Sequence, residues 1–192
     1  MNNDPIARFK DVYARADASG IELPDAASLA TVDANGRPSV RMVLIKEATD
    51  RGFVFYTNTE SRKGLDLETN RHAALCCWWS TIQEQVRVEG SVELVSNEEA
   101  DAYFATRDRD SQIGAWASQQ SRAMDSKDDL SRNFDEFSRE FENAEVPRPP
   151  HWTGYRINPD NIEFWIGKPN RLHERFLYER DGDGWKTTIL YP

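Results

Sequence analysis

The sequence predicts an α+β protein, mainly β, in which an antiparallel β-barrel carries peripheral helices. Short strands are joined by tight turns, of which Asn35-Gly36 is the strongest hairpin signal. Helical segments are inserted between groups of these strands. The chain has 192 residues and shows no internal repeat or low-complexity linker. We therefore expect one domain over residues 1–192, with room for a sizeable core.

The first half of the chain begins with a helix and continues as strands. Apolar residues at helical spacing follow Asp4-Pro5, which suits a cap and a first turn, within an N-terminal segment 1–20. Ser61 opens a second, short helix. The expected elements are a helix over 5–18, strands over 28–33, 38–45 and 53–57, a helix over 61–70, and strands over 73–79 and 85–95.

Helices dominate the middle of the chain, and strands return at its end. Ser96-Asn-Glu-Glu99 has the residues of a capping box, and Pro147-Arg-Pro-Pro150 ends the helical region. We expect a helical insertion over 96–145, packed on the barrel. Its helices are expected over 96–105, 110–121 and 128–142, followed by strands over 153–157, 163–166, 173–179 and 185–190.

The composition narrows the function classes. A net charge of −9 argues against a general surface for nucleic acid or for an anionic membrane. Cys76 and Cys77 are adjacent within an apolar run, which fits a reducing cytoplasm better than a disulfide framework. The polar N-terminus is not expected to be a signal peptide, and no apolar run is long enough for a membrane span. Three scattered histidines make a metal site improbable.

Arg171, His173 and Arg175 form the most informative pattern. They occupy alternate positions, so one strand would send all three side chains to the same face. Such a face is either a solvated strand edge or a pocket for an anionic small molecule. Because the chain is acidic overall, cations that bind an anion must be concentrated locally.

Two other segments concentrate cations and hydroxyl groups. Arg41 and Lys46 flank an apolar strand, Tyr56-Thr57 closes the next one, and Ser61-Arg62-Lys63 opens a helix whose free N–H groups suit a phosphate. If the helix were continuous, Tyr103, Arg107 and Ser111 would lie along one face of it, where they could hold a second phosphate. The alternative in both cases is ordinary surface charge.

Several short motifs follow one another along the chain from about Ser28 to its end. They are 41–46 (RMVLIK), 54–58 (VFYTN), 61–63 (SRK), 85–90 (QVRVEG), 109–116 (RDSQIGAW), 118–121 (SQQS), 163–165 (EFW) and 171–175 (RLHER). In these motifs and their order the chain resembles the pyridoxine/pyridoxamine 5′-phosphate oxidase family of FMN-binding split barrels. Glu84 departs from the family pattern, which often has an arginine there.

The resemblance implies a cytoplasmic homodimer with FMN sites at its interface, and an FMN-dependent oxidase that uses O2 and releases H2O2. Its substrate would be pyridoxamine or pyridoxine 5′-phosphate and its product pyridoxal 5′-phosphate. Arg171 and His173 would be catalytic, and Lys46, Tyr103, Arg107 and Ser111 would bind substrate with them. The residues implied to bind FMN are Arg41, Met42, Val43, Leu44, Lys46, Tyr56, Thr57, Arg62, Lys63, Gln85, Gln120, Ser121, Trp165 and Arg175.

Two alternatives remain open on the sequence. A related split-barrel flavin oxidase could act on another substrate, such as a phenazine precursor. A non-catalytic protein could bind FMN or pyridoxal phosphate through the same residues. The cluster of Lys46, Tyr103, Arg107 and Ser111 favours a phosphorylated substrate, since a substrate without phosphate has no need for it.

Overall fold

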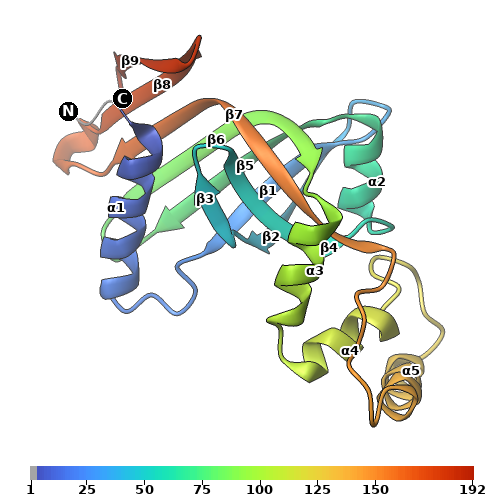
Figure 1. Cartoon of the computed structure of the whole chain (residues 1–192). Helices are drawn as coiled ribbons and strands as arrows, with labels where there is room; N and C mark the ends of the chain where they lie inside the picture. Colours follow the sequence, from blue (N-terminus) through green and yellow to red (C-terminus); the bar gives the residue numbers. More distant parts are fainter. Residues whose placement is uncertain (1–3) are drawn as a thin grey trace.

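A computed structural model describes residues 4–192, so the first three residues of the predicted segment 1–20 lie outside the described residues. Nine strands of the described chain form one antiparallel sheet, ordered β2-β1-β5-β6-β7-β4-β3, with β8 pairing to β7 and β9 to β8 (Figure 1). The backbone N–H of Lys46 donates to the carbonyl of Val54 at 2.8 Å and extends the pairing of β3 with β4, while residues 45 and 46 lead directly from β2 at one edge of this path to β3 at the other. The antiparallel barrel fold that the sequence predicts is confirmed.

Most predicted elements match the structure closely. The short strand β3 is an addition, and the strand and helix bounds otherwise differ mainly at their ends. The strands are β1 (Ala26–Val32), β2 (Pro38–Leu44), β3 (Glu47–Thr49), β4 (Gly52–Asn58), β5 (His72–Trp79), β6 (Glu84–Leu94), β7 (Trp152–Ile166), β8 (Glu174–Asp181) and β9 (Gly184–Leu190). The helices are α1 (Pro5–Ala18), α2 (Arg62–Thr69), α3 (Asn97–Ala105), α4 (Arg109–Ala117) and α5 (Lys127–Glu140).

Helix α1 closes one side of the barrel core (Figure 1). The Asp4 carboxylate caps it by accepting the N–H of Ile6 at 2.8 Å. Its apolar face is buried, and the Phe9 ring meets Phe53 edge-on at 4.9 Å between centroids and Trp79 at 6.0 Å. Burying one such side chain contributes roughly 1.5–3 kcal/mol. The helix is therefore held mainly by its amphipathic packing.

Two arginines of α1 fix the strands that carry candidate site residues. The Arg8 guanidinium lies over the rings of Phe164 and Phe176, 4.5 and 4.3 Å from their centroids. Arg15 donates two hydrogen bonds to the buried carboxylate of Glu84, at 2.6 and 2.9 Å. Glu84 therefore has its own cationic partner, although it departs from the family pattern.

The structure corrects the prediction of separate strands over 153–157 and 163–166, because β7 runs unbroken through both. Pro159 sits opposite Gly90, where the register between β6 and β7 shifts at a bulge. A bulge tolerates proline, which cannot donate to the ladder. A Cβ at Gly90 would lie 2.0 Å from the carbonyl oxygen of Asn158, so glycine permits this close approach. One continuous strand thus links the two ends of the barrel.

Helices α3, α4 and α5 pack beside the barrel around a second apolar cluster that includes Phe104, Ile113 and Trp152. The capping box at Ser96 is confirmed, with both reciprocal hydrogen bonds formed. The predicted helix over 110–121 is too long, since α4 ends at Ala117 and Ser121 has a left-handed φ of +72°. Residues 118–121 therefore form a loop. No helix in the described part of the chain is long and apolar enough to cross a membrane.

Glu99 links α3 to the barrel. We expect the interactions of its carboxylate to make the free energy of unfolding depend on pH. Its carboxylate accepts the Ser96 N–H and hydrogen bonds from Arg51 and Arg156, and these interactions, the Ser96 N–H first, lower its pKa to about 2. A lowered pKa stabilises the folded state above the ordinary value near 4.5, and this stabilisation is lost as the pH falls towards 2.

Glu99→Gln should therefore unfold at lower urea concentration than the wild type at pH 7. The difference should shrink as the pH falls below about 4.5. Urea titrations at pH 7 and pH 3 measure it. A difference that stays constant across this range would contradict the assigned ion pairs.

Candidate functional site

The end of β4 and the start of α2 enclose a buried lysine. Lys63 is 8% exposed, and its ammonium donates to the hydroxyl oxygens of Thr57 at 2.9 Å and Ser61 at 3.1 Å. Its third bond goes to the side-chain oxygen of Gln120 at 3.0 Å. Gly64 makes the tight approach possible, because a Cβ there would lie 2.0 Å from the carbonyl oxygen of Thr59. The sequence thus folds a cation into the interior beside a helix N-terminus.

Lys63 lacks a counter-charge. All three of its acceptors are neutral, and no ion pair found among residues 4–192 includes it. Burial first, and then the nearby Arg41, lower its pKa to about 8. Asp66 instead lies 3.6 Å from the Arg41 guanidinium. A buried, hydrogen-bonded ammonium of this kind is suited to a phosphate or another anion.

The other candidate residues on β2 and α2 differ in how far they are buried. Arg41 points inward and donates to Thr31 Oγ1 at 2.6 Å, whereas Arg62 is exposed at the start of α2. Met42 and Leu44 are exposed and Val43 is buried, as the alternation of β2 requires.

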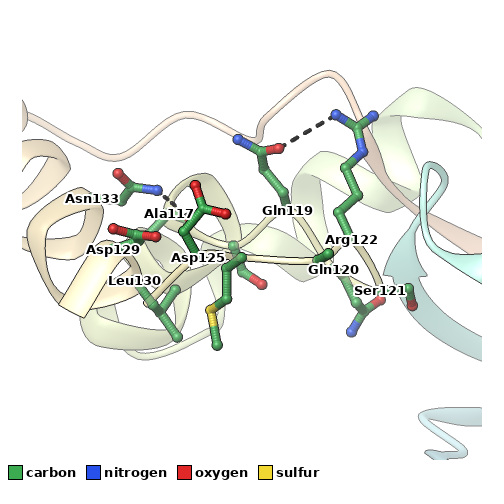
Figure 2. Close-up of a pocket in the computed structure, with 12 residues that line it drawn as sticks. Ala117, Gln119, Gln120, Ser121, Arg122, Asp125, Asp129, Leu130 and Asn133 are labelled. Carbon is green, nitrogen blue, oxygen red and sulfur yellow. Dashed lines mark hydrogen bonds between the residues drawn. The ribbon is translucent and has the colours of Figure 1, made fainter. Parts of the chain in front are cut away.

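Gln120 and Ser121 lie in the loop after α4. Figure 2 shows this loop beside α5, with Asn133 donating to the carbonyl of Ala117. A pocket of about 400 Å³ lies between them, and Gln120 and Ser121 line it. Since Gln120 also accepts from Thr57 and Lys63, the loop is tied to the cation site.

A second pocket, of about 470 Å³, gathers the predicted phosphate group of Lys46, Tyr103, Arg107 and Ser111. The two helices are separate, as the expected ranges 96–105 and 110–121 imply. Because α3 ends at Ala105 and α4 begins at Arg109, Tyr103, Arg107 and Ser111 do not lie along one continuous helix. The break at 106–108 turns the two helices about the pocket. Arg107 sits in the break itself, so the residues meet through a bend of the chain.

Aromatic rings form the walls of this pocket, and Arg107 packs against one of them. The Tyr56 ring stacks on Tyr103 at 4.0 Å and on Trp152 at 5.2 Å. Arg107 lies 5.1 Å from the centroid of Trp152, and its buried Nη1 has no hydrogen-bond partner in the structure. Burial lowers the Arg107 pKa. A buried guanidinium nitrogen without a partner fits an anionic ligand, since leaving it unpaired is costly.

The remaining candidates surround Trp165, near the far end of β7. Trp165 pairs with Gln85 of β6 and with Arg175 of β8, and its ring lies 4.4 Å from the imidazole of His173. Arg175 donates to both oxygens of Glu163, at 2.8 and 3.0 Å. Burial raises the pKa of Glu163, but Arg175 and Arg87 together bring it below the ordinary value. Arg175 is therefore fixed by a buried carboxylate.

The structure corrects the predicted cationic strand face. β8 begins at Glu174, so only Arg175 of the three residues is in the strand. Arg171 ends a short 3₁₀ turn with a left-handed φ of +61° and is exposed. His173 Nδ1 accepts the backbone N–H of Lys168 at 3.2 Å. Loop geometry, not strand alternation, places Arg171 and His173.

The candidate residues form two groups at opposite ends of β7. Tyr56 and Thr57 pair with Gly154 and Thr153, at the start of that strand, and Trp165 lies eleven residues beyond Gly154. Eleven residues span about 35 Å of extended chain. Figure 1 likewise shows the β8–β9 hairpin and helices α3–α5 at opposite ends of the molecule. One chain therefore does not bring Arg171 and His173 to the pocket of Arg107.

Comparison with known proteins shows full-length similarity. Residues 15–143 match the family model of pyridoxamine 5′-phosphate oxidase, and residues 152–192 match the pyridoxine 5′-phosphate oxidase C-terminal dimerisation region. The pyridoxine/pyridoxamine 5′-phosphate oxidase of Myxococcus xanthus is 50% identical, over 98% of this chain and 92% of that protein. The oxidase of the same name from Sphingopyxis alaskensis is 52% identical, over 100% and 89%.

Solved structures agree on the fold. PhzG from Burkholderia lata 383, in complex with tetrahydrophenazine-1-carboxylic acid, has a TM-score of 0.94 and 34% identity, over 99% of this chain and 93% of that one. A pyridoxamine 5′-phosphate oxidase-related, FMN-binding protein from Nostoc punctiforme has a TM-score of 0.77 at 18% identity, with full coverage of both chains, and supports the fold alone. From these matches, the chain belongs to the pyridoxamine 5′-phosphate oxidase family.

Proposed function

We propose that this protein is an FMN-dependent oxidase that produces pyridoxal 5′-phosphate. Pyridoxamine 5′-phosphate, O2 and water would give pyridoxal 5′-phosphate, ammonia and H2O2; pyridoxine 5′-phosphate and O2 would give pyridoxal 5′-phosphate and H2O2. The observation that carries the proposal is the pair of separate cation sites at Lys63 and Arg107. Lys63 is buried, Arg107 is half-buried with one buried nitrogen unpaired, and neither cation forms an ion pair within residues 4–192, which suits two phosphate groups.

The Lys63 site fits the phosphate of FMN. Lys63 would hold it together with Arg62 and the N–H groups at the start of α2. Thr57 and Gln120 would keep the ammonium oriented through their present hydrogen bonds. FMN, when bound, would supply the redox chemistry, taking two electrons from the substrate and passing them to O2. The protein supplies binding and orientation.

The Arg107 pocket fits the substrate phosphate. Arg107 would donate its free Nη1 to a phosphate oxygen, and Lys46 and Ser111 would contribute further hydrogen bonds. Tyr103 closes the side of the pocket with its ring. A phosphate fixed here sets where the rest of the substrate lies.

A second copy of the chain would complete the site. Arg171 and His173 belong to the region that matches a dimerisation region, and they lie at the other end of β7 from the Arg107 pocket. In the proposed homodimer these two residues reach the pocket from the partner subunit. Arg171 would fix the substrate ring, while His173 would orient its polar groups or accept a proton.

A phenazine-type oxidase is the second candidate, since PhzG resembles this chain closely in structure. The phosphate-oxidase relatives are more similar in sequence, at 50% and 52% identity against 34%. The unpaired nitrogen of Arg107 in the second pocket also favours a ligand that carries an anionic group. A non-catalytic FMN or pyridoxal phosphate binder would use the same residues and is separated by turnover alone.

The deciding experiment incubates purified protein, loaded with FMN, with pyridoxamine 5′-phosphate under air. We expect H2O2 release together with an equal amount of pyridoxal 5′-phosphate. Flavin binding without turnover would instead support the binding protein. A protein that cannot take up FMN would contradict both functions.

Arg171→Ala and Arg175→Ala should separate substrate handling from flavin binding. Arg171 is exposed in a turn, so its loss should lower kcat/KM at least about 100-fold with little change in flavin retention. Arg175 is fixed on Glu163 beside Trp165, at the same end of β7 as Arg171, and in the proposed homodimer it would reach the flavin across the interface, so its loss should chiefly weaken flavin retention. Steady-state kinetics and flavin absorbance of the purified variants measure both effects, and equal effects would refute this division.

A further inference from the structure

Lys46 of the Arg107 pocket is paired with a carboxylate that the sequence motifs do not include. Its ammonium lies 2.6 Å from Asp25 Oδ2, and the exposed fractions of the two side chains are 28% and 18%. Lys46 lines the pocket, whereas Asp25 lies outside the pocket lining. Asp25 therefore contacts the lysine from outside the pocket.

The backbone fixes this pair. Ala26 is opposite Leu44 in the β1–β2 ladder, and just beyond it the N–H of Ile45 donates to the carbonyl of Asp25 at 2.8 Å. The N–H of Lys46 is held by the carbonyl of Val54, also at 2.8 Å. With both backbones hydrogen-bonded, the carboxylate and the ammonium stay within reach of each other.

The two cations of the pocket are therefore unequal. Arg107 has a buried nitrogen without a partner, and the carboxylate nearest to it in sequence, Asp108, caps α4 by accepting the N–H of Ser111 at 2.8 Å. Lys46 already has a negative partner in the absence of ligand. A ligand phosphate gains the full attraction of Arg107, but it must share Lys46 with Asp25.

We propose that Asp25 is an affinity-setting residue, which competes with the ligand phosphate for Lys46 and so weakens the binding of phosphorylated substrate and product. This inference rests on the proposed function, because it takes the ligand of the pocket to be a phosphate monoester. Such a group carries about 1.5–2 negative charges near neutral pH. The Asp25 carboxylate repels this phosphate and occupies the Lys46 ammonium, a hydrogen-bond donor that the phosphate would otherwise use. Both effects favour release of the product.

The test measures dissociation constants of pyridoxal 5′-phosphate for the FMN-loaded protein and its variants. Asp25→Asn keeps the size of the side chain and removes its charge. We expect it to bind pyridoxal 5′-phosphate about tenfold more tightly than the wild type. KM for pyridoxamine 5′-phosphate should fall as well, while pyridoxal, which lacks the phosphate, should bind equally to both proteins.

Two further variants make the test specific. Asp17→Asn removes an exposed carboxylate of α1 and should leave the dissociation constant unchanged, which controls for net charge. In a Lys46→Met background, Asp25→Asn should have no effect on phosphate affinity, since the contested ammonium is gone. This dependence on Lys46 would not arise if Asp25 only supported the fold.

Unchanged or weaker binding of pyridoxal 5′-phosphate to Asp25→Asn would overturn the inference, as would tighter binding that persists in the Lys46→Met background. Neither result would affect the proposed function. If the wild type binds no pyridoxal 5′-phosphate, the proposed function fails and this inference fails with it.

Discussion

Lys63→Met is expected to lose FMN while its apo-protein remains about as stable as the wild-type apo-protein. Lys63 is a buried cation whose three partners are neutral oxygen atoms, so burial costs the folded apo-protein free energy. Methionine fills a similar volume without charge. Removing the desolvation cost of the buried charge should offset the loss of its three hydrogen bonds in the apo-protein.

The effect on FMN should be large and opposite. A charge-assisted hydrogen bond contributes about 1.5–3 kcal/mol, so losing the ammonium should weaken FMN binding about 100-fold. Fluorescence titration of apo-protein with FMN measures the affinity, and thermal melts with and without FMN measure the stability. Lys10→Met, on the exposed face of α1, is the matched control and should behave as wild type.

The same lysine predicts a pH dependence of FMN affinity. Burial brings its pKa in the apo-protein to about 8, and a bound phosphate should raise it again. Affinity should therefore be nearly constant between about pH 7 and 8, where the phosphate is mostly doubly ionised, and fall as the pH rises above 8, where the free lysine loses its proton. Lys63→Met should show no such fall. A wild-type affinity that is flat up to pH 9.5 would contradict the assignment of Lys63 to the phosphate.

The local signals in the sequence predicted most of the fold for physical reasons. The cap at Asp4, the hairpin at Asn35-Gly36 and the capping box at Ser96 act within a few residues, and the structure forms all three. The error at β7 has a different origin. Pro159 and its polar neighbours look like a turn, and only the facing residue, Gly90 on another strand, allows the strand to continue.

The site was predictable where the residues themselves carry its chemistry, and less so where tertiary structure arranges them. Arg107 and Ser111 were identified from the spacing they would have in a continuous helix, whereas the structure brings them together through the break at 106–108. The alternation of Arg171 and His173 suggested a strand, although a left-handed turn holds them. Asp25 was missed, yet the hairpin register places it opposite Ile45, next to Lys46, and that register was a usable signal.

Of the proposed variants, Arg107→Met is expected to weaken substrate binding most. Its buried Nη1 is without a hydrogen bond and is available to a phosphate, and its guanidinium packs against Trp152 and Phe104. We expect KM for pyridoxamine 5′-phosphate to rise about 100-fold, since one charge-assisted pair contributes about 1.5–3 kcal/mol. FMN content should stay at the wild-type level, because Lys63 and its partners are untouched.

The chemistry of the phosphate provides the internal control. With pyridoxamine, which lacks the phosphate, wild type and Arg107→Met should have the same low kcat/KM, because neither can use the Arg107 contact. Arg37→Met, in the exposed β1–β2 turn, should match the wild type on both substrates. An equal loss on both substrates would mean that Arg107 supports the fold and not the phosphate. A loss confined to the phosphorylated substrate assigns this pocket, and with it the substrate class, to phosphate recognition.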